Sequence, residues 1–224
     1  MRFRGQPIQA VLFDMDGLLV DTEAFWQSVE QECIQKVAGL TPQAEDFEST
    51  MGLRIDEVLD WWQLRFPDQI TAQRKPVLLD CILSGVLARI QGEARALPGI
   101  QDLLEYLQER SIPLALVSSS HVRLIEAVLD RLDWRAVFRV IASAENEVHG
   151  KPHPAVWLTA AHKLGLNPVY CLALEDSVNG VISARAARMQ CVAIPAPEQR
   201  GRGAFQAADL VLQNPLELIR ELEP

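Results

Sequence analysis

No part of the 224-residue sequence is apolar over the roughly 18 consecutive residues that a membrane-spanning helix needs. The first residues hold no apolar segment followed by a small-residue cleavage site, so they do not form a secretion signal. Lysine and arginine are nowhere densely clustered, and the net charge is −9. Because a chain this acidic repels polyanions, we expect a cytoplasmic protein that binds neither nucleic acid nor a membrane surface.

Cysteine is scarce as well. The four cysteines, Cys33, Cys81, Cys171 and Cys191, lie far apart and include no CxxC pair. Zinc sites and disulfide frameworks usually show closer and more regular spacing. The pattern therefore predicts buried thiols in a reducing compartment rather than a disulfide or a zinc site.

Hydrophobic residues make up 49% of the chain, which is enough to bury a core, and the length suits one domain with an insertion. Several short apolar runs are each bounded by polar or turn residues. Such runs are typical of strands buried on both faces of a parallel sheet. They cover residues 10–13, 113–117, 137–142, 170–174 and 191–194.

Segments with helical periodicity separate these runs. Apolar residues recur at i, i+3, i+4 and i+7 in residues 100–107, 125–132 and 157–164, the last of which follows Pro154. Strand and helix patterns alternate from Leu97 to the C-terminus. This order predicts an α/β fold with a doubly wound parallel sheet and right-handed crossovers.

The stretch after the first strand breaks the alternation. From Thr22 to about Gln91 the patterns are helical, with apolar stripes in residues 55–62 and 79–90. Trp62 belongs to the first stripe, so we assign it to packing rather than to sugar stacking. We predict an all-helical cap domain, residues 22–91, inserted into a core domain formed by residues 1–21 and 92–224.

Two carboxylates, Asp14 and Asp16, directly follow the first strand, and Gly17 allows a sharp turn after them. At i and i+2 of an extended chain, the two side chains lie roughly 7 Å apart on the same side. Such a pair is repulsive unless a cation lies between the carboxylates or one of them holds a proton. An acidic turn is the ordinary explanation of this fragment taken alone.

Three further strand ends carry polar residues. They are Ser118, Ser119 and Ser120 after the second run, Lys151 after the third, and Glu175 with Asp176 after the fourth. Hydroxyls and N–H groups at a helix start suit phosphoryl oxygens, and carboxylates suit Mg²⁺. A helix cap, a surface lysine and a solvated helix start would explain each feature separately. Their occurrence in one order at strand ends, where ligands of open α/β sheets bind, predicts one site.

Over essentially its whole length, the sequence resembles the haloacid dehalogenase (HAD) superfamily of phosphohydrolases. The motifs that carry the resemblance are Asp14-Met15-Asp16-Gly17, Ser118, Lys151 and Glu175-Asp176-Ser177. The resemblance implies a HAD-like, Rossmannoid core, and the helical insertion resembles the C1 cap. Residues 13–23 and 51–56 resemble bacterial sugar phosphatases, nearest to the 2-deoxyglucose-6-phosphate and hexitol phosphatases.

The resemblance implies a role for each motif residue. Asp14 would be the nucleophile that forms a phospho-aspartate, and Asp16 the general acid and then the general base. Lys151 and Ser118 would hold the phosphoryl oxygens. The implied Mg²⁺ ligands are Asp14, Asp16 through its carbonyl, Asp176 and, partly through water, Glu175. The implied substrate-binding residues are Ser119, Ser120, Gly17 and Arg54. The implied partner is a small phosphomonoester, and the implied state is a monomer.

Two other functions compete with a phosphatase. A β-phosphoglucomutase would have the same fold, but the mutases of this family carry a histidine in the cap linker where this chain has Trp26. A phospho-accepting receiver domain also combines acidic residues, a hydroxyl and a lysine, but it is shorter and has no inserted cap. Dehalogenases of the superfamily lack the second aspartate. We therefore expect a Mg²⁺-dependent phosphatase of hexose or hexitol 6-phosphates.

Overall fold

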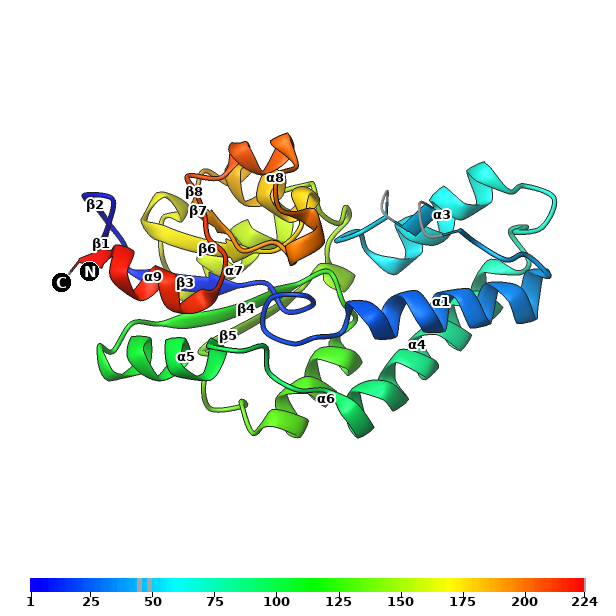
Figure 1. The fold of residues 1–224 in the computed structure, drawn as a ribbon, viewed down its shortest axis with the longest axis horizontal. Helices are drawn as coiled ribbons and strands as arrows, with labels where there is room; N and C mark the ends of the chain where they lie inside the picture. The colour runs from blue at the N-terminus through cyan, green and yellow to red at the C-terminus, as the bar shows by residue number, and fades with distance from the viewer. Residues whose placement is uncertain (44–45, 48–49, 224) are drawn as a thin grey trace.

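The computed structural model describes residues 1–43, 46–47 and 50–223. Figure 1 shows a sheet-containing core on one side and a group of helices on the other, joined by two chain crossings. None of the described helices is both long enough and apolar enough to cross a membrane.

The core contains a six-stranded sheet whose pairings are all parallel. In spatial order its strands are β5 (Val140–Ser143), β4 (Leu114–Ser118), β3 (Ala10–Phe13), β6 (Cys171–Glu175), β7 (Gln190–Ala193) and β8 (Leu210–Val211). Along the chain, β4 and β5 are added outward on one side of β3, and β6, β7 and β8 are then added outward on the other side. The predicted doubly wound parallel sheet is confirmed, and β3 coincides with its predicted run.

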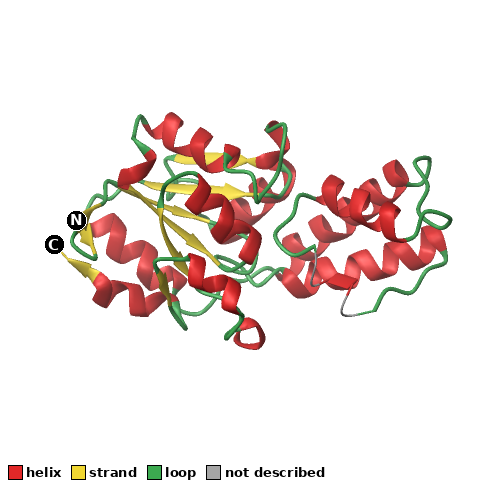
Figure 2. Ribbon diagram, turned by 90° about the horizontal axis from the view of Figure 1, so that it is seen from above, coloured by secondary structure: helices red, strands yellow, loops and turns green. Residues whose placement is uncertain are grey.

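Helices cover both faces of this sheet (Figure 2). They are α5 (Ile100–Glu109), α6 (Val122–Leu132), α7 (Ala155–Leu164), α8 (Val178–Ala186) and α9 (Pro215–Glu221), with short 3₁₀ turns at Ala144–Asn146, Pro168–Tyr170, Pro197–Gln199 and Gly203–Ala207. The three core helices expected from periodicity are confirmed in α5, α6 and α7. Pro154 lies at the N-cap of α7, one position before the first turn.

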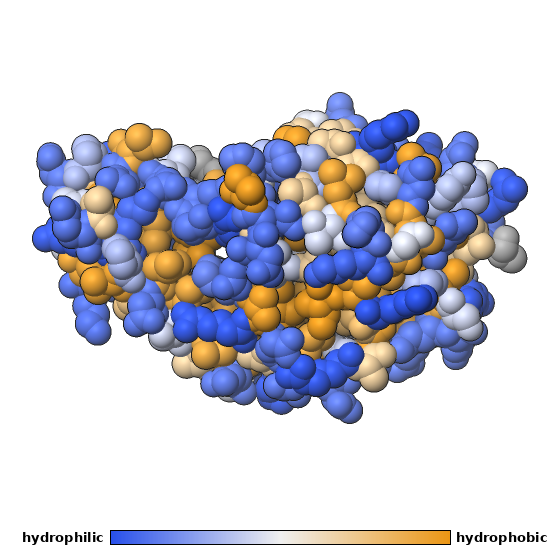
Figure 3. Space-filling model, turned by 180° about the vertical axis from the view of Figure 1, so that it is seen from behind, coloured by the Kyte–Doolittle hydropathy of each residue, from blue (hydrophilic) through white to orange (hydrophobic). Residues whose placement is uncertain are grey.

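The central strands β3, β4 and β6 are apolar up to the polar residues at their carboxyl ends, because both of their faces are buried. Along β3, Val11 and Phe13 pack into one hydrophobic cluster, whereas Ala10 and Leu12 pack into a second one. Polar side chains cover most of the outer surface seen in Figure 3, although apolar ones show through over the core. The sheet is therefore a rigid interior platform, and its strand ends are positioned by packing on both sides.

The cap is built from α1 (Glu23–Ala38), α3 (Ile55–Arg65) and α4 (Lys75–Glu93). Helix α4 packs against α1 and α3 within the cap and against α6 of the core. Trp62 of α3 is fully buried, in agreement with the predicted packing role. The first and last cap helices lie next to the boundaries expected at residues 22 and 91, which stay a prediction.

A second, antiparallel sheet joins the two ends of the chain. Its strands are β2 (Gln6–Pro7), β1 (Arg2–Phe3) and β9 (Leu222–Glu223), and Figure 1 shows the two termini side by side. Strands of two residues carry no periodic pattern, so this sheet could not be predicted from the sequence.

The prediction of four free thiols is wrong for one pair of cysteines. Cys33 of α1 and Cys81 of α4 form a disulfide, whereas Cys171 and Cys191 are free and buried. The two bonded cysteines are 48 residues apart in the sequence, and only the packing of α1 against α4 brings them together. Sequence spacing could not reveal this, because connectivity depends on tertiary proximity.

We predict that the disulfide contributes measurably to cap stability. Closing a loop of 48 residues is worth about 4 kcal/mol by the chain-entropy account. Reduction with dithiothreitol should therefore shift the urea unfolding midpoint downward. The Cys33→Ser/Cys81→Ser double variant is the control and should unfold alike with and without the reductant. An unchanged midpoint for the wild-type chain would contradict the prediction.

Candidate active site

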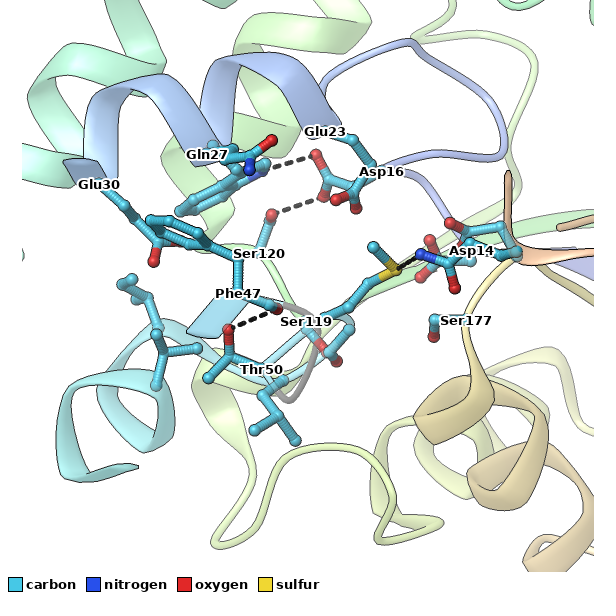
Figure 4. A pocket seen from close by; sticks show the side chains of 18 of the residues that line it. Asp14, Asp16, Glu23, Gln27, Glu30, Phe47, Thr50, Ser119, Ser120 and Ser177 are labelled. Carbon is cyan, nitrogen blue, oxygen red and sulfur yellow. Dashed lines mark hydrogen bonds between the residues drawn. The ribbon is translucent and has the colours of Figure 1, made fainter. Parts of the chain in front are cut away.

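The polar residues expected to form a site gather at one edge of the sheet. They lie at or after the carboxyl ends of β3, β4, β5 and β6, which are neighbours in the sheet, and strand order reverses direction at β3. Open α/β sheets bind ligands at such a reversal point. A pocket of about 280 Å³ lies there, between the core and the cap, and Asp14, Asp16, Ser120 and Asp176 contribute to its lining (Figure 4).

A buried lysine bridges two carboxylates at the base of this site. Lys151 Nζ donates to Asp14 Oδ1 at 2.5 Å and to Glu175 Oε1 at 2.6 Å. The lysine is only 1% exposed. Burial disfavours its charged form, but the two carboxylates outweigh burial and raise the pKa of Lys151 above its ordinary value. Lys151 is therefore a fixed positive charge beside Asp14.

Negative charge nevertheless exceeds positive charge at this point. Ligand atoms of Asp14, Glu175 and Asp176 lie within 4.8 Å of one another, and all three residues are buried. Burial, together with the neighbouring carboxylates, raises the pKa of Asp14 and of Asp176 well above the usual range. Such a cluster is stable only if protons or a bound cation offset its charge, and hard oxygen ligands fit Mg²⁺.

The two acidic residues after β6 are not equivalent. Glu175 uses both oxygens within the protein, since Oε1 accepts from Lys151 and Oε2 accepts from the Asp176 N–H and from the N–H and hydroxyl of Ser177. In the described part of the chain, no hydrogen-bond donor reaches the Asp176 carboxylate. Asp176 is therefore the freer of the two to bind a cation, and Glu175 is suited to hold Lys151 and the start of α8.

Asp16 is held between the core and the cap. Its Oδ1 accepts from Thr22 Oγ1 at 2.6 Å and from Trp26 Nε1 at 3.1 Å. Its Oδ2 accepts from Ser120 Oγ at 2.7 Å and from Ser118 Oγ at 3.4 Å. Figure 4 shows Asp16 with bonds to the cap helix on one side and to Ser120 on the other. Both domains thus fix the orientation of one carboxyl group.

The remaining serine and the glycine have local partners. Ser119 lines the pocket, and its hydroxyl donates to the carbonyl of Gly52 in the cap. Gly17 has a φ of +78°, and a Cβ at this position would lie 2.2 Å from Asp176 Oδ2. Glycine is thus required both by the turn after Asp16 and by the close approach of Asp176.

Arg54 lies at the contact between the cap and the core, and its predicted role in substrate binding stays a prediction. It is absent from the described lining of the pocket. Its guanidinium donates to the Asp56 carboxylate and to the carbonyl oxygens of Ala144 and Glu147. These acceptors satisfy the guanidinium at the cap–core contact. In this structure Arg54 ties the start of α3 to the segment after β5.

Several pocket residues were not identified from the sequence. Trp26 lines the pocket and, with the neighbouring Thr22, donates to Asp16, a role that the sequence did not predict. Glu23, Gln27 and Glu30 of α1 also line the pocket. Their spacing of i, i+4 and i+7 is a signal that could have placed them on one helix face, but it did not indicate that this face meets the core.

Comparisons of sequence and of structure with known proteins point to one family. Residues 8–188 match the family of haloacid dehalogenase-like hydrolases. Hexitol phosphatase B of Escherichia coli strain K12 is 36% identical over 94% of each chain. The structure of CbbY from Rhodobacter sphaeroides with xylulose-(1,5)-bisphosphate superposes with a TM-score of 0.85, at 25% identity over 97% of this chain and 100% of that one. The structure of a β-phosphoglucomutase from Clostridium difficile superposes with a TM-score of 0.82, at 27% identity over 96% of each chain.

The position of Glu175 leads to a stability prediction at Gly180 in α8. A Cβ at Gly180 would lie 1.8 Å from Glu175 Oε1, and this carboxylate is held by Lys151. Gly180→Ala should therefore lower the free energy of unfolding, measured in urea, by roughly 1–3 kcal/mol. This loss is expected even though alanine has a higher helix propensity than glycine.

Gly92 of α4 is the matched control for this substitution. Nothing lies within 4 Å of the Cβ that Gly92→Ala would add, so this variant should be stabilised by up to about 1 kcal/mol. Equal stabilisation by both substitutions would show that Glu175 is not held against α8.

Proposed function

Because the chain belongs to the family of haloacid dehalogenase-like hydrolases and is a sugar phosphatase, we propose that it hydrolyses hexose or hexitol 6-phosphates with Mg²⁺ through a phospho-aspartate on Asp14. The observation that carries the proposal is the contact between Asp14 and Lys151 at the base of the pocket, with Asp176 beside them. The proposed nucleophile, a fixed positive charge and a proposed metal ligand are thus side by side.

In the first half of the proposed reaction, Asp14 attacks phosphorus. Lys151 holds Oδ1, which leaves Oδ2 as the attacking oxygen. The bond from Asp14 to phosphorus forms as the bond to the sugar oxygen breaks, and Asp16 delivers the proton that this oxygen needs. Lys151 and the bound Mg²⁺ would offset the negative charge that otherwise repels a carboxylate from a phosphate ester. The proposed metal ligands are Asp14, Asp176 and the carbonyl of Asp16.

In the second half, water cleaves the phospho-aspartate. Asp16, now without its proton, accepts one from the attacking water, and inorganic phosphate leaves with Asp14 regenerated. The contacts of Asp16 support this double role. Hydroxyls such as those of Thr22 and Ser120 can either donate or accept, so they can follow a proton onto and off the carboxyl. The Trp26 indole can only donate, which keeps Oδ1 an acceptor.

Relatives support hydrolysis of a hexitol or hexose phosphate over isomerisation. The relationship to the Escherichia coli hexitol phosphatase extends over 94% of this chain, cap included. Structural similarity to a β-phosphoglucomutase keeps isomerisation as the alternative. Where those mutases are expected to carry a histidine, Trp26 donates to the proposed acid–base group. An indole cannot exchange protons near neutral pH, so it cannot replace an imidazole in that role.

We predict that phosphate release from mannitol or sorbitol 6-phosphate requires both Mg²⁺ and Asp14. EDTA should abolish release, and added Mg²⁺ should restore it. Asp14→Asn should lower kcat roughly a thousandfold or more, because the amide is not a nucleophile. Asp102→Asn, an exposed substitution on α5, is the control and should keep full activity. Release that survives either EDTA or Asp14→Asn would refute the mechanism.

A second measurement separates hydrolysis from isomerisation. With glucose 1-phosphate and Mg²⁺, followed by ³¹P NMR, we expect inorganic phosphate to be the product whether or not glucose 1,6-bisphosphate is added. Conversion to glucose 6-phosphate that depends on the bisphosphate would identify a mutase instead.

A further inference from the structure

One face of α1 extends the pocket from the proposed phosphate site deep into the cap. Glu23, Gln27 and Glu30 line it at successive helical turns. At 1.5 Å per residue, Glu30 lies about 10 Å further along the helix than Glu23. Figure 4 places Glu30, with Phe47 and Thr50, at the opposite end of the pocket from Asp14 and Ser177. The cap end is thus remote from the phosphoryl group.

Glu30 is the unusual residue at this cap end. It is only 7% exposed, and its Oε2 is buried without a hydrogen-bond partner in the part of the chain that the structure describes. The N–H of the buried Trp62 comes close without forming a hydrogen bond. Buried polar groups normally have partners, so an unpartnered carboxyl that lines a pocket indicates that a ligand supplies one.

Burial also determines the form of the carboxyl group. Burial raises the pKa of Glu30 to about 8. The nearby Trp62 N–H lowers this pKa and the negative charge of Glu23 raises it, but both effects are smaller than that of burial. Near neutral pH, Glu30 is therefore largely a neutral carboxylic acid, which both donates and accepts hydrogen bonds. A sugar hydroxyl has the same dual capacity and is its natural counterpart.

The charge of the lining points to the same kind of ligand. Among the described lining residues are Asp16, Glu23, Glu30 and Glu198, but no lysine or arginine. Arg54, the cation that the sequence placed near the substrate, is bound to Asp56 and to two carbonyl oxygens instead. A second phosphate or a carboxylate at the cap end would be buried without a counter-charge, which is strongly unfavourable.

We propose that Glu30, with Gln27 one turn before it, binds the hydroxyl groups at the end of the substrate remote from the phosphate. The pocket thereby selects a neutral six-carbon polyol or sugar chain that carries one phosphate. It disfavours short phosphomonoesters, which do not reach Glu30, and bisphosphates, which bring a second anion to it. This inference rests on the proposed phosphatase function and specifies its substrate class.

The test compares substrates of different length in wild type, Glu30→Met, Glu30→Gln and Gln27→Leu. Kinetics are measured with sorbitol 6-phosphate and with glycerol 3-phosphate. Glu30→Met should lower kcat/KM for sorbitol 6-phosphate roughly 10- to 100-fold, mostly through KM, because a hydrogen bond is lost. Its effect on glycerol 3-phosphate should be at least tenfold smaller. Glu30→Gln, which still donates and accepts, should recover most of the lost affinity.

Glu32→Met is the matched control, because Glu32 is exposed on the same helix and does not line the pocket. It should leave both substrates unaffected. If Glu30→Met does not fold, Gln27→Leu decides, since Gln27 is exposed to the pocket and its replacement disturbs no packing. It too should impair sorbitol 6-phosphate selectively. Equal losses on both substrates, or none on sorbitol 6-phosphate, would overturn the assignment.

A bisphosphate comparison tests the charge argument separately. Wild type should hydrolyse fructose 1,6-bisphosphate with a kcat/KM at least tenfold below that for fructose 6-phosphate, and an equal or higher value would overturn the exclusion of a second anion. The proposed function itself fails only if wild type with Mg²⁺ releases phosphate from none of these compounds. Uniform losses in the variants of an active enzyme would refute the role of Glu30 and leave that function standing.

Discussion

The ammonium group of Lys151, buried between Asp14 and Glu175, is the interaction on which the site depends. An ammonium out of water is stable only with close partners, and loss of one partner of a buried pair costs about 3–5 kcal/mol. Asp14 directly follows β3, and Glu175 ends β6 and binds the start of α8, so one cation links neighbouring strands and a helix. The contacts that stabilise the buried Lys151 ammonium therefore also hold the Asp14 carboxylate, the proposed nucleophile, in place.

The carboxylates of the site outnumber its one buried lysine, and the protein as a whole has a net charge of −9. The overall field does not attract the substrate, so capture must be local. A cation at Asp14 and Asp176 would offset both the carboxylate cluster and the phosphoryl oxygens. The core supplies this charge chemistry from rigid strand ends, where packing on both sheet faces limits movement.

The cap supplies the other half of the site. Helix α1 contributes donors to Asp16 close to the core and Glu30 at the far end of the pocket, whereas Arg54 fastens α3 to the segment after β5. In the proposed function, the core therefore carries the reaction chemistry and the cap the choice of substrate. Asp16 accepts hydrogen bonds from serines of the core and from Thr22 and Trp26 next to or within the cap, so this one carboxyl group connects the core to the cap.

Local patterns in the sequence determined the parallel sheet, the core helices and the position of Asp14 at a strand end, because burial on two faces and helical periodicity are recorded in neighbouring residues. Local patterns also placed Lys151 and Asp176 at strand ends, although the role of each came from family resemblance. Only tertiary structure decided the Cys33–Cys81 bond, the contact of Arg54 with the segment after β5 and the position of Glu30 in the pocket lining. Each of these depends on how the cap helices pack on one another and on the core, and contacts between segments distant in the chain leave no trace in local spacing.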